Sequence, residues 1–337
     1  MERAASVAKK LAVVGNGSWG TAQVKLLSEN GHQVRWWMRK PEDVAYVQAH
    51  GHNPSYLSDV SLDLARVLPT HSLADALQDA EIVFLVVPAA FVGAVLAQVA
   101  PAWLQDRTVV SGIKGIVPGE NLLITDYLER HLGVPGARQA ILAGPCHAEE
   151  VALEKQSYLT IGATNLETAT QVATLLQGRF MTCSPSLDLY GLEYAAILKN
   201  IVAIACGIAH GLRYGDNFLA VLVSNALKEI EDFVQATCPP CTRRMADSGY
   251  VGDVLVTSYS QFSRNRTFGT MLGRGYSVQA AQLEMNMVAE GYYASRCIGE
   301  LNERHRVAMP VIETVHGILY QKQNPRQAFE RLAGVLR

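Results

Sequence analysis

The sequence predicts an α/β half built on a doubly wound parallel sheet, followed by an all-helical half. Two observations lead to this prediction. In the first half, short runs that are apolar throughout alternate with helix-periodic stretches, a pattern typical of parallel strands covered on both faces. After about Pro185 the chain changes to long segments rich in Ala and Leu, without strand patterns. We therefore expect a sheet domain over residues 1–187 and a helical domain over 188–337.

Each expected strand is a short apolar run that ends at a glycine, a proline or a polar turn. Helix-periodic segments lie between several of them, and a strand–helix–strand block closes the first half. The expected strands are residues 10–15, 33–38, 81–87, 107–112, 139–144, 157–163 and 180–184. The expected helices of this half are 19–30, 91–99, 122–132 and 166–177, and those of the second half are 193–212, 218–238 and helical segments from 277 to 336.

Composition excludes several classes of function. The 337 residues carry a formal net charge of −2, so no global basic field attracts nucleic acid. No uncharged apolar run reaches the roughly 20 residues that span a bilayer, so we expect no membrane insertion. The opening "MERAASVAKK" lacks the apolar stretch of a signal peptide, which favours a cytoplasmic protein.

The six cysteines are scattered, and in a reducing compartment we expect most of them to be small buried apolar residues. "CPPC" at Cys238–Cys241 has the spacing of a redox or metal site, but no second pair completes a set of ligands. The simpler interpretation is a turn stiffened by proline. We expect no metal.

A glycine motif lies directly after the first expected strand. Gly15, Gly17 and Gly20 form G-x-G-x-x-G at the start of an expected helix. In this context the first glycine permits a sharp turn, the second lets backbone N–H groups reach a pyrophosphate, and the third lets helix and strand pack closely. The helix N-terminus adds partial positive charge. The motif predicts dinucleotide binding; the alternative is a glycine turn that only packs the fold.

The second expected strand ends in "WWMRK", at the position where an acidic residue would bind the ribose hydroxyls of NAD. Arg39 and Lys40 instead offer positive charge to a 2′-phosphate. We therefore expect NADP to be preferred over NAD, with Arg39 as the stronger candidate of the two. The alternative is that both are solvated loop cations.

One lysine, Lys199, interrupts the apolar helix "AAILKNIVAIACGIAHGL". Because burying a lone ammonium is costly, it should have a lowered pKa or face a counter-ion, and Asp253 could supply that charge. Such a lysine suits general acid–base chemistry between a carbonyl and an alcohol. The alternative is a lysine at the edge of the apolar face whose amine reaches water.

Further polar residues stand where ligands bind in open α/β sheets, just past strand ends. Lys114 in "SGIKGI" and the segment "AGPCHAEEV" each follow an expected strand. The segment "GDVLVTSYSQFSRNRTFG" resembles a loop and gathers five candidate site residues. These are Asp253, Thr257, Ser263, Arg264 and Asn265.

With these motifs in place, the chain resembles the bacterial type of NAD(P)-dependent glycerol-3-phosphate dehydrogenase, nearly from end to end. The resemblance implies a Rossmann-type first domain, an all-α substrate domain and a homodimer. It also implies reversible reduction of dihydroxyacetone phosphate to sn-glycerol 3-phosphate for phospholipid synthesis. The segments that carry it are "GNGSWGTA", "SGIKGI", "AGPCHAEEV", "LKNIVAIACGIAHGLRYGDN", "VGDVLVT", "FSRNRTFG", "AEG" and "MPVIETVHGILYQKQNP".

The same resemblance implies a role for each matching residue. Lys199 is expected to be the catalytic acid/base, with Lys114 and Asp253 beside it. The substrate contacts implied are Lys114, Gly144, Cys146, Lys199, Asp253, Thr257, Ser263, Arg264 and Asn265. The cofactor contacts implied are Gly15, Gly17, Ser18, Trp19, Gly20, Arg39, Lys114, Ala148, Arg264, Val288 and Glu290.

Three positions depart from the family pattern. Cys146 and His147 stand where relatives read "GPSFA" or "GPTFA", so Cys146 lacks a hydroxyl that could bind substrate. His147 either replaces the aromatic ring in packing or relays a proton. His210 stands where the family usually has Asp, which would alter the charge near the substrate.

Two other functions compete with this one. A reductase of the same architecture could act on ketopantoate or a β-hydroxyacid, but "SRNR" together with "LKN" favours a phosphate ester over a carboxylate. A regulator that senses NADP without catalysis would be expected to lack Lys199, Lys114 or Asp253, and all three are present.

Overall fold

The computed structural model describes residues 8–285 and 289–337, which divide into two compact units. The first unit contains the chain up to Ile113 together with Ile124–Leu142 and Cys146–Leu189. The second contains Tyr190–Arg337 and two short segments from the first half of the chain, Lys114–Leu123 and Ala143–Pro145. The residues that follow two strand ends, including Lys114 and Gly144, therefore cluster with the helical unit.

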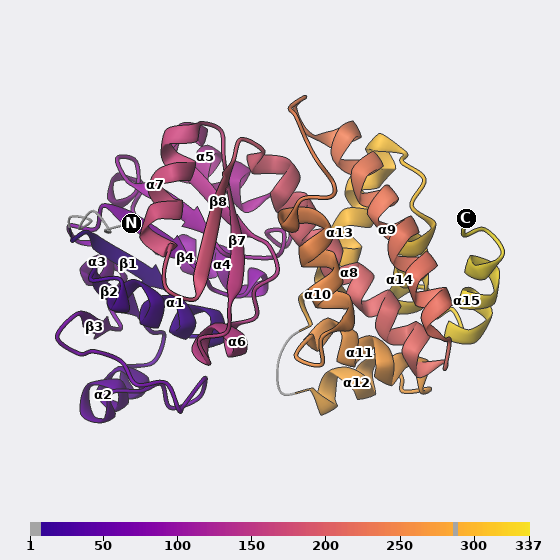
Figure 1. Ribbon diagram of the computed structural model, residues 1–337, viewed down its shortest axis with the longest axis horizontal. Helices are drawn as coiled ribbons and strands as arrows, with labels where there is room; N and C mark the ends of the chain where they lie inside the picture. Colours follow the sequence, from indigo (N-terminus) through magenta and orange to yellow (C-terminus); the bar gives the residue numbers. More distant parts are fainter. Residues whose placement is uncertain (1–7, 286–288) are drawn as a thin grey trace. The chain divides into compact units, whose positions relative to one another are not determined.

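The first unit is built on an eight-stranded sheet in the order β3-β2-β1-β4-β5-β6-β7-β8 (Figure 1). The pairings of β1 with β2 and β4, β2 with β3, β4 with β5, β5 with β6, and β7 with β8 are all parallel. The strands are β1 Lys10–Val14, β2 Gln33–Trp37, β3 Val67–Thr70, β4 Ile82–Leu85, β5 Thr108–Ser111, β6 Gln139–Ala143, β7 Ser157–Ala163 and β8 Met181–Ser186.

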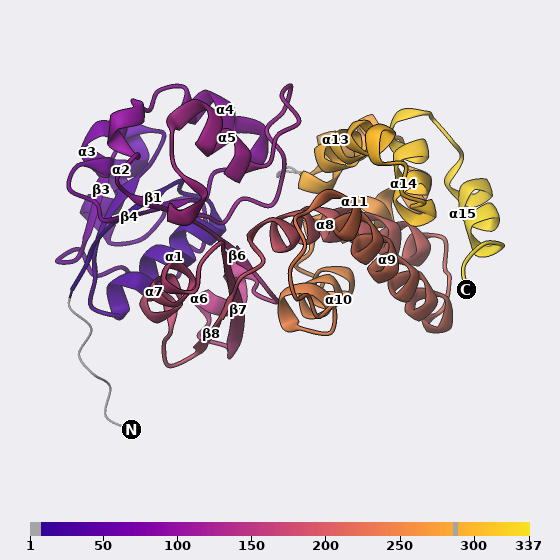
Figure 2. The same cartoon turned by 90° about the horizontal axis from the view of Figure 1, so that it is seen from above.

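Helices cover both faces of this sheet, as the apolar strands predict. Figure 2 shows α1, α6 and α7 on one face and α4 and α5 on the other. Because the strand order reverses between β1 and β4, a crevice for a ligand is expected outside their carboxyl ends. The helices are α1 Ser18–Glu29, α2 Pro41–His50, α3 Leu73–Leu77, α4 Ala89–Leu96, α5 Ile124–Leu132, α6 Ala148–Ala152 and α7 Leu166–Leu176.

Apart from Ala143 at the end of β6 and an isolated bridge between Val117 and Leu122, the regular elements among the described residues of the second unit are helices, and the predicted fold class is confirmed. Its helices are α8 Leu189–Gly211, α9 Asp216–Thr237, α10 Asp253–Tyr259, α11 Arg264–Gly273, α12 Val278–Glu284, α13 Glu290–His305, α14 Pro310–Tyr320 and α15 Pro325–Ala333, with a π-helix, η3 Ser248–Gly252, directly before α10. By length and composition α8 could cross a membrane, but 94% of its most apolar 18-residue window is buried inside the protein, as in the core helix of a globular domain.

Three local predictions are wrong. The strand β3 was not predicted. It carries Pro69, which lowers the strand signal in the sequence and is tolerated because β3 lies at the edge of the sheet. The loop-like segment is instead two short helices, since Ser263 caps α11 through the N–H of Arg266 (3.3 Å) and Phe268 is buried. The CPPC segment is not a turn: residues 239–244 have no assigned turn or helix, because successive prolines favour extended backbone.

Glycines bring α8 and α11 into backbone contact. A Cβ built on Gly207 of α8 would lie 2.1 Å from the carbonyl oxygen of Arg266, and one on Gly269 of α11 would lie 2.1 Å from that of Ile204. Gly211 and Gly273 repeat the pattern one turn along, since a Cβ built on either would lie 2.4 Å from a backbone carbonyl oxygen of the other helix. These four glycines fix the separation of the helix that carries Lys199 from the helix that begins at Arg264.

A buried carboxylate fastens the start of α14. Glu229 of α9 is 4% exposed, and its oxygens accept the N–H groups of Val311 (2.7 Å) and Ile312 (3.1 Å). Burial raises the pKa of Glu229 to about 7, although the two N–H donors act in the opposite direction. The folded protein therefore binds this proton more tightly than the unfolded chain does.

The glycine contact predicts that Gly207→Ala will lower the free energy of unfolding by at least about 2 kcal/mol, because the new methyl group meets backbone that cannot move aside alone. Gly334→Ala is the matched control, since its backbone is right-handed (φ −74°) and its Cβ would make only an ordinary 3.4 Å contact. Urea titration compares the two variants with the wild type. Equal stability of all three would contradict the contact.

The pKa of Glu229 predicts a pH-dependent stability. Because the folded-state pKa is raised from 4.5 to about 7, the free energy of unfolding should fall as the pH rises through that interval. One proton contributes at most about 1.4 kcal/mol per pH unit. In Glu229→Gln this contribution to the dependence of the unfolding free energy on pH should disappear. In Glu303→Gln, a control at an exposed residue of α13, it should remain. Urea titrations at pH 5, 6 and 7 measure it, and an unchanged slope in Glu229→Gln would refute it.

Candidate active site

The glycine loop of the first unit has the geometry of a phosphate-binding loop. Gly15 follows β1 with φ +125°, and a Cβ there would lie 2.9 Å from the backbone of Val86, which follows β4. A Cβ on Gly20 would lie 2.2 Å from the carbonyl oxygen of Gly15, so helix and loop pack without side chains between them. A Cβ on Gly17 would meet nothing within 4 Å. That open side is where a pyrophosphate could approach the N-terminus of α1.

Trp19 gives a second indication of a ligand in this crevice. It lies in the first turn of α1, and its Nε1 atom would be 2.9 Å from a Cβ on Gly112, the residue that follows β5. The indole N–H is buried and donates to no described residue. Because a buried donor without an acceptor is costly, a bound group that accepts this hydrogen bond would stabilise the site. The residues present therefore fit a dinucleotide.

Arg39 and Lys40 lie between β2 and α2, both exposed. Lys40 is the N-cap residue of α2, so both cations stand beside a helix N-terminus. Two acidic residues, Glu42 and Asp43, lie in the first turn of α2, and Asp43 accepts a hydrogen bond from Asn16 of the glycine loop (3.1 Å). Both cations are therefore accessible to solvent at the end of β2.

The remaining residues expected at the cofactor are spread over both units. Ala148 is the first residue of α6 and is buried, and His147 before it is the N-cap residue. Cys146 is partly buried against the core of the first unit. Glu290 is the first residue of α13 in the second unit. Val288 lies outside the described residues.

In the second unit, the amine of Lys199 contacts the carboxylate of Asp253. Lys199 lies in the middle of α8 and is 8% exposed, while Asp253 begins α10 and is 1% exposed. Lys199 Nζ donates to Oδ1 of Asp253, so the structure provides the counter-ion that a buried lysine requires. Only 9% of the Lys199 side chain is exposed, so it does not extend from the edge of the helix into solvent.

The second carboxylate oxygen of Asp253 binds the turn that carries Gly144. The N–H of Gly144 donates to Oδ2 of Asp253 (3.1 Å), and the hydroxyl of Thr257 donates to the carbonyl of Asp253 (2.7 Å). The side chain of Asn200, next to Lys199 in α8, donates to the carbonyl of Lys114 (3.2 Å). These hydrogen bonds place four of the predicted site residues beside the part of α8 that carries Lys199 and Asn200: they are Lys114, Gly144, Asp253 and Thr257.

The start of α11 forms a second polar group in the same unit. Ser263 is buried as the N-cap residue, Arg264 is exposed at the first position, and Asn265 is 8% exposed. Oδ1 of Asn265 accepts the N–H of Gly291 in α13 (2.9 Å), which orients the amide so that its NH₂ group faces away from that contact. Arg264, this NH₂ group and the helix N-terminus together provide donors for a phosphate.

Sequence reasoning missed two residues of this group. Asn200 was not predicted, although a second polar residue beside Lys199 in an apolar helix was a usable signal. Gly291 was not predicted either, although it ends the segment "AEG" that contributes to the resemblance; its role depends on a close approach, since a Cβ there would lie 2.6 Å from the carbonyl oxygen of Asn200. His210, where the family pattern has Asp, is exposed at the end of α8.

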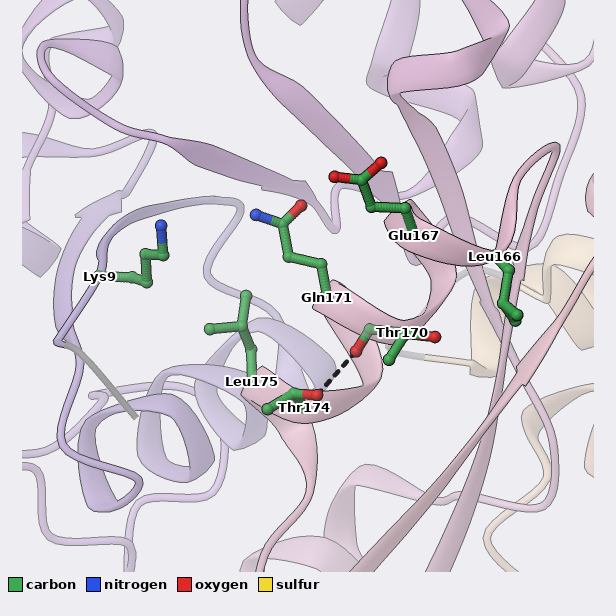
Figure 3. Close-up of a pocket in the computed structure, with 7 residues that line it drawn as sticks. All are labelled: Lys9, Leu166, Glu167, Thr170, Gln171, Thr174 and Leu175. Carbon is green, nitrogen blue, oxygen red and sulfur yellow. Dashed lines mark hydrogen bonds between the residues drawn. The ribbon is translucent and has the colours of Figure 1, made fainter. Parts of the chain in front are cut away.

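Other features of the described residues offer little catalytic chemistry. Burial raises the pKa of the Cys206 thiol on α8 to about 11, so it remains neutral at physiological pH. No group of three or more His, Cys, Asp or Glu side chains among the described residues could hold a metal ion. A hollow of about 570 Å³ beside α7 is lined mainly by apolar surface and includes none of the predicted site residues; it is formed by Lys9, Leu166, Glu167, Thr170, Gln171, Thr174 and Leu175 (Figure 3).

Comparison with known proteins agrees with both units. Residues 10–169 match the model of the N-terminus of NAD-dependent glycerol-3-phosphate dehydrogenases, and residues 188–330 match that of the C-terminus. Among curated relatives, the glycerol-3-phosphate dehydrogenase [NAD(P)+] of Bacillus velezensis is 34% identical over 326 residues, 96% of this chain and 94% of its own. That of Streptococcus sanguinis is 34% identical over 95% of this chain and 94% of its own.

Solved structures agree as well. The glycerol-3-phosphate dehydrogenase of Coxiella burnetii matches with a TM-score of 0.90 at 29% identity, covering 97% of this chain and 99% of that one. A ketopantoate reductase from Ralstonia eutropha matches with a TM-score of 0.58 at 16% identity, covering 96% of this chain and 99% of that one, a likeness of fold alone. This chain, an oxidoreductase that uses a nicotinamide cofactor, belongs to the family of NAD-dependent glycerol-3-phosphate dehydrogenases.

Proposed function

We propose that this enzyme reversibly reduces dihydroxyacetone phosphate to sn-glycerol 3-phosphate, with Lys199 as the general acid and base. The contact that carries the proposal is that between Lys199 and Asp253, because it holds a charged amine in a buried position. The bound nicotinamide supplies the hydride to the ketone carbon. Lys199 Nζ donates a proton to the oxygen that becomes negative, and recovers it when glycerol 3-phosphate is oxidised.

The residues around Lys199 keep this amine ready for transfer. Asp253 holds it with Oδ1, while Gly144 occupies Oδ2 and prevents the carboxylate from turning away. Thr257, one turn further along α10, donates to the carbonyl of Asp253, and in the proposal its side chain also faces the substrate hydroxyls. Lys114 adds a second positive charge that stabilises the developing alkoxide in a site with little water.

The phosphate of the substrate is assigned to the start of α11. Arg264 and the NH₂ group of Asn265 supply charge-assisted hydrogen bonds, and Ser263 keeps the helix N-terminus in place through its cap. Binding energy gained at this remote group orients the carbonyl for reaction. The arrangement favours a phosphate ester over the carboxylate substrates of other two-domain reductases.

The cofactor is assigned to the glycine loop, with NADP preferred over NAD because Arg39 stands where an acid would contact a free ribose hydroxyl. In this proposal residues 1–187 form the cofactor domain and 188–337 the substrate domain, with Glu290 contributing to the cofactor from α13. The enzyme works as a cytoplasmic homodimer, and its product serves glycerophospholipid synthesis.

A steady-state assay tests the proposed reaction. Oxidation of NADPH should be rapid with dihydroxyacetone phosphate, slower with NADH as the donor, and negligible with ketopantoate. The value of kcat/KM should be much lower for dihydroxyacetone than for its phosphate, because dihydroxyacetone has no phosphate group for Arg264 and Asn265 to bind. Faster turnover of ketopantoate than of the phosphorylated ketone would refute the proposed substrate.

Replacing the proposed acid tests its role. Lys199→Ala should lower kcat by at least about 100-fold, the contribution typical of a general acid, while the dissociation constant of NADPH changes less than about twofold. Lys228→Ala, an exposed lysine on α9, should keep the wild-type kcat. Lys199→Ala leaves the buried carboxylate of Asp253 without a counter-ion, which could unfold the protein. The double variant Lys199→Ala/Asp253→Asn removes that charge as well, so assaying both variants shows whether loss of folding explains the result. Turnover near the wild-type rate in a folded Lys199→Ala protein would reject the role.

A further inference from the structure

The glycine loop is fastened by a residue that no motif marks. Asn53 lies after α2 and is completely buried. Its Nδ2 atom donates to the carbonyl oxygen of Asn16 (2.9 Å) and to Oγ1 of Thr21 on α1 (2.8 Å). Its Oδ1 atom accepts the N–H groups of Ser55 (2.9 Å) and Tyr56 (3.1 Å). One side chain therefore joins the glycine loop, the first helix and the connection that leads to β3.

The next carbonyl in the loop is held by Thr21. The carbonyl oxygen of Gly17 accepts both the N–H of Thr21 (2.9 Å) and its hydroxyl proton (3.1 Å). Since the Thr21 hydroxyl gives its proton to Gly17, it can accept the one offered by Asn53. Asn53 and Thr21 thus fix two successive carbonyl groups through one connected network.

Fixing these carbonyls also fixes the N–H groups on the other side of each peptide. In a planar trans peptide the C=O and N–H bonds point in opposite directions. The carbonyl of Asn16 shares its peptide with the N–H of Gly17, and the carbonyl of Gly17 shares its peptide with the N–H of Ser18. Neither N–H donates to another described residue, and the space beside Gly17 is open. Both N–H groups are therefore oriented before any ligand binds.

We propose that Asn53 is a positioning residue that aims the N–H groups of Gly17 and Ser18 at the pyrophosphate of the nicotinamide dinucleotide. The inference rests on the proposed function, because it requires that the glycine loop bind this cofactor. Asn53 touches neither cofactor nor substrate; it acts by removing the freedom of the loop to turn these two donors away. Losing a hydrogen bond to a charged group weakens binding by about 10- to 100-fold, which sets the scale of the effect.

Binding of NADPH in the absence of substrate tests the proposal, followed by fluorescence titration of the full-length protein. Asn53→Ala should raise the dissociation constant of NADPH by about 10- to 100-fold, with kcat at saturating NADPH and the KM for dihydroxyacetone phosphate nearly unchanged. Asn30→Ala is the matched control: Asn30, at the other end of α1, also donates to two backbone carbonyls, those of Leu175 (2.8 Å) and Gln177 (3.2 Å). It should lower thermal stability without changing NADPH affinity.

Thr21→Val keeps the shape of its side chain but removes the hydroxyl that links Asn53 to Gly17, so it should weaken NADPH binding in the same way. If Asn53→Ala fails to fold, the NADPH affinity of Thr21→Val tests the inference instead. Combined with Asn53→Ala, its effect on affinity should be less than additive, because both act on one network. Wild-type affinity for NADPH in folded Asn53→Ala would overturn the inference. If Asn53→Ala does not fold, wild-type affinity in Thr21→Val would overturn it. An equal loss of NADPH affinity in Asn30→Ala would also overturn it. Failure of the wild type to bind any nicotinamide dinucleotide would instead overturn the proposed function, and this inference with it.

Discussion

The buried contact between Lys199 and Asp253 is the interaction around which the candidate site of the helical unit is arranged. An ammonium and a carboxylate removed from water each lose several kcal/mol of hydration, so neither is tolerated there alone. The structure satisfies both: Lys199 donates to one oxygen of Asp253, and the backbone of Gly144 donates to the other. Such a pair contributes little net stability compared with apolar residues of the same volume, so its presence is better explained by chemistry than by folding.

The surroundings of this pair show how a protein holds a charged group in place. A π-helix, η3, directly precedes Asp253, and irregular helical turns of this kind occur frequently at functional sites. A Cβ on Gly252 would lie within 3.4 Å of Pro145, so the turn at Gly144 and the start of α10 pack closely. The crossing of α8 and α11 through Gly207 and Gly269 then sets the separation of the amine from the donors at the start of α11.

The two units solve a similar physical problem with different means. In the first, neutral hydrogen bonds from Asn53 and Thr21 hold the carbonyl groups of the glycine loop, and in our proposal this orients the N–H groups that bind the cofactor. In the second, a full charge must be kept on a lysine inside an apolar helix, and this requires an opposite charge in contact. In each unit, a buried side chain holds the group that we propose to bind the ligand.

By itself, the sequence determined every strand of the sheet except β3, the change to an all-helical half and the glycine loop, because these follow from local periodicity and from glycines at fixed spacing. It also determined that Lys199 needed a partner, since a lone amine in an apolar helix is costly to bury. Only the tertiary structure decided that β3 completes the sheet and that the segment around Arg264 is helical, because an edge strand and a short capped helix depend on their neighbours. The same holds for Asn53 and Asn200: an asparagine is common in loops and helices alike, and its role appears only when distant carbonyl groups come within hydrogen-bonding distance.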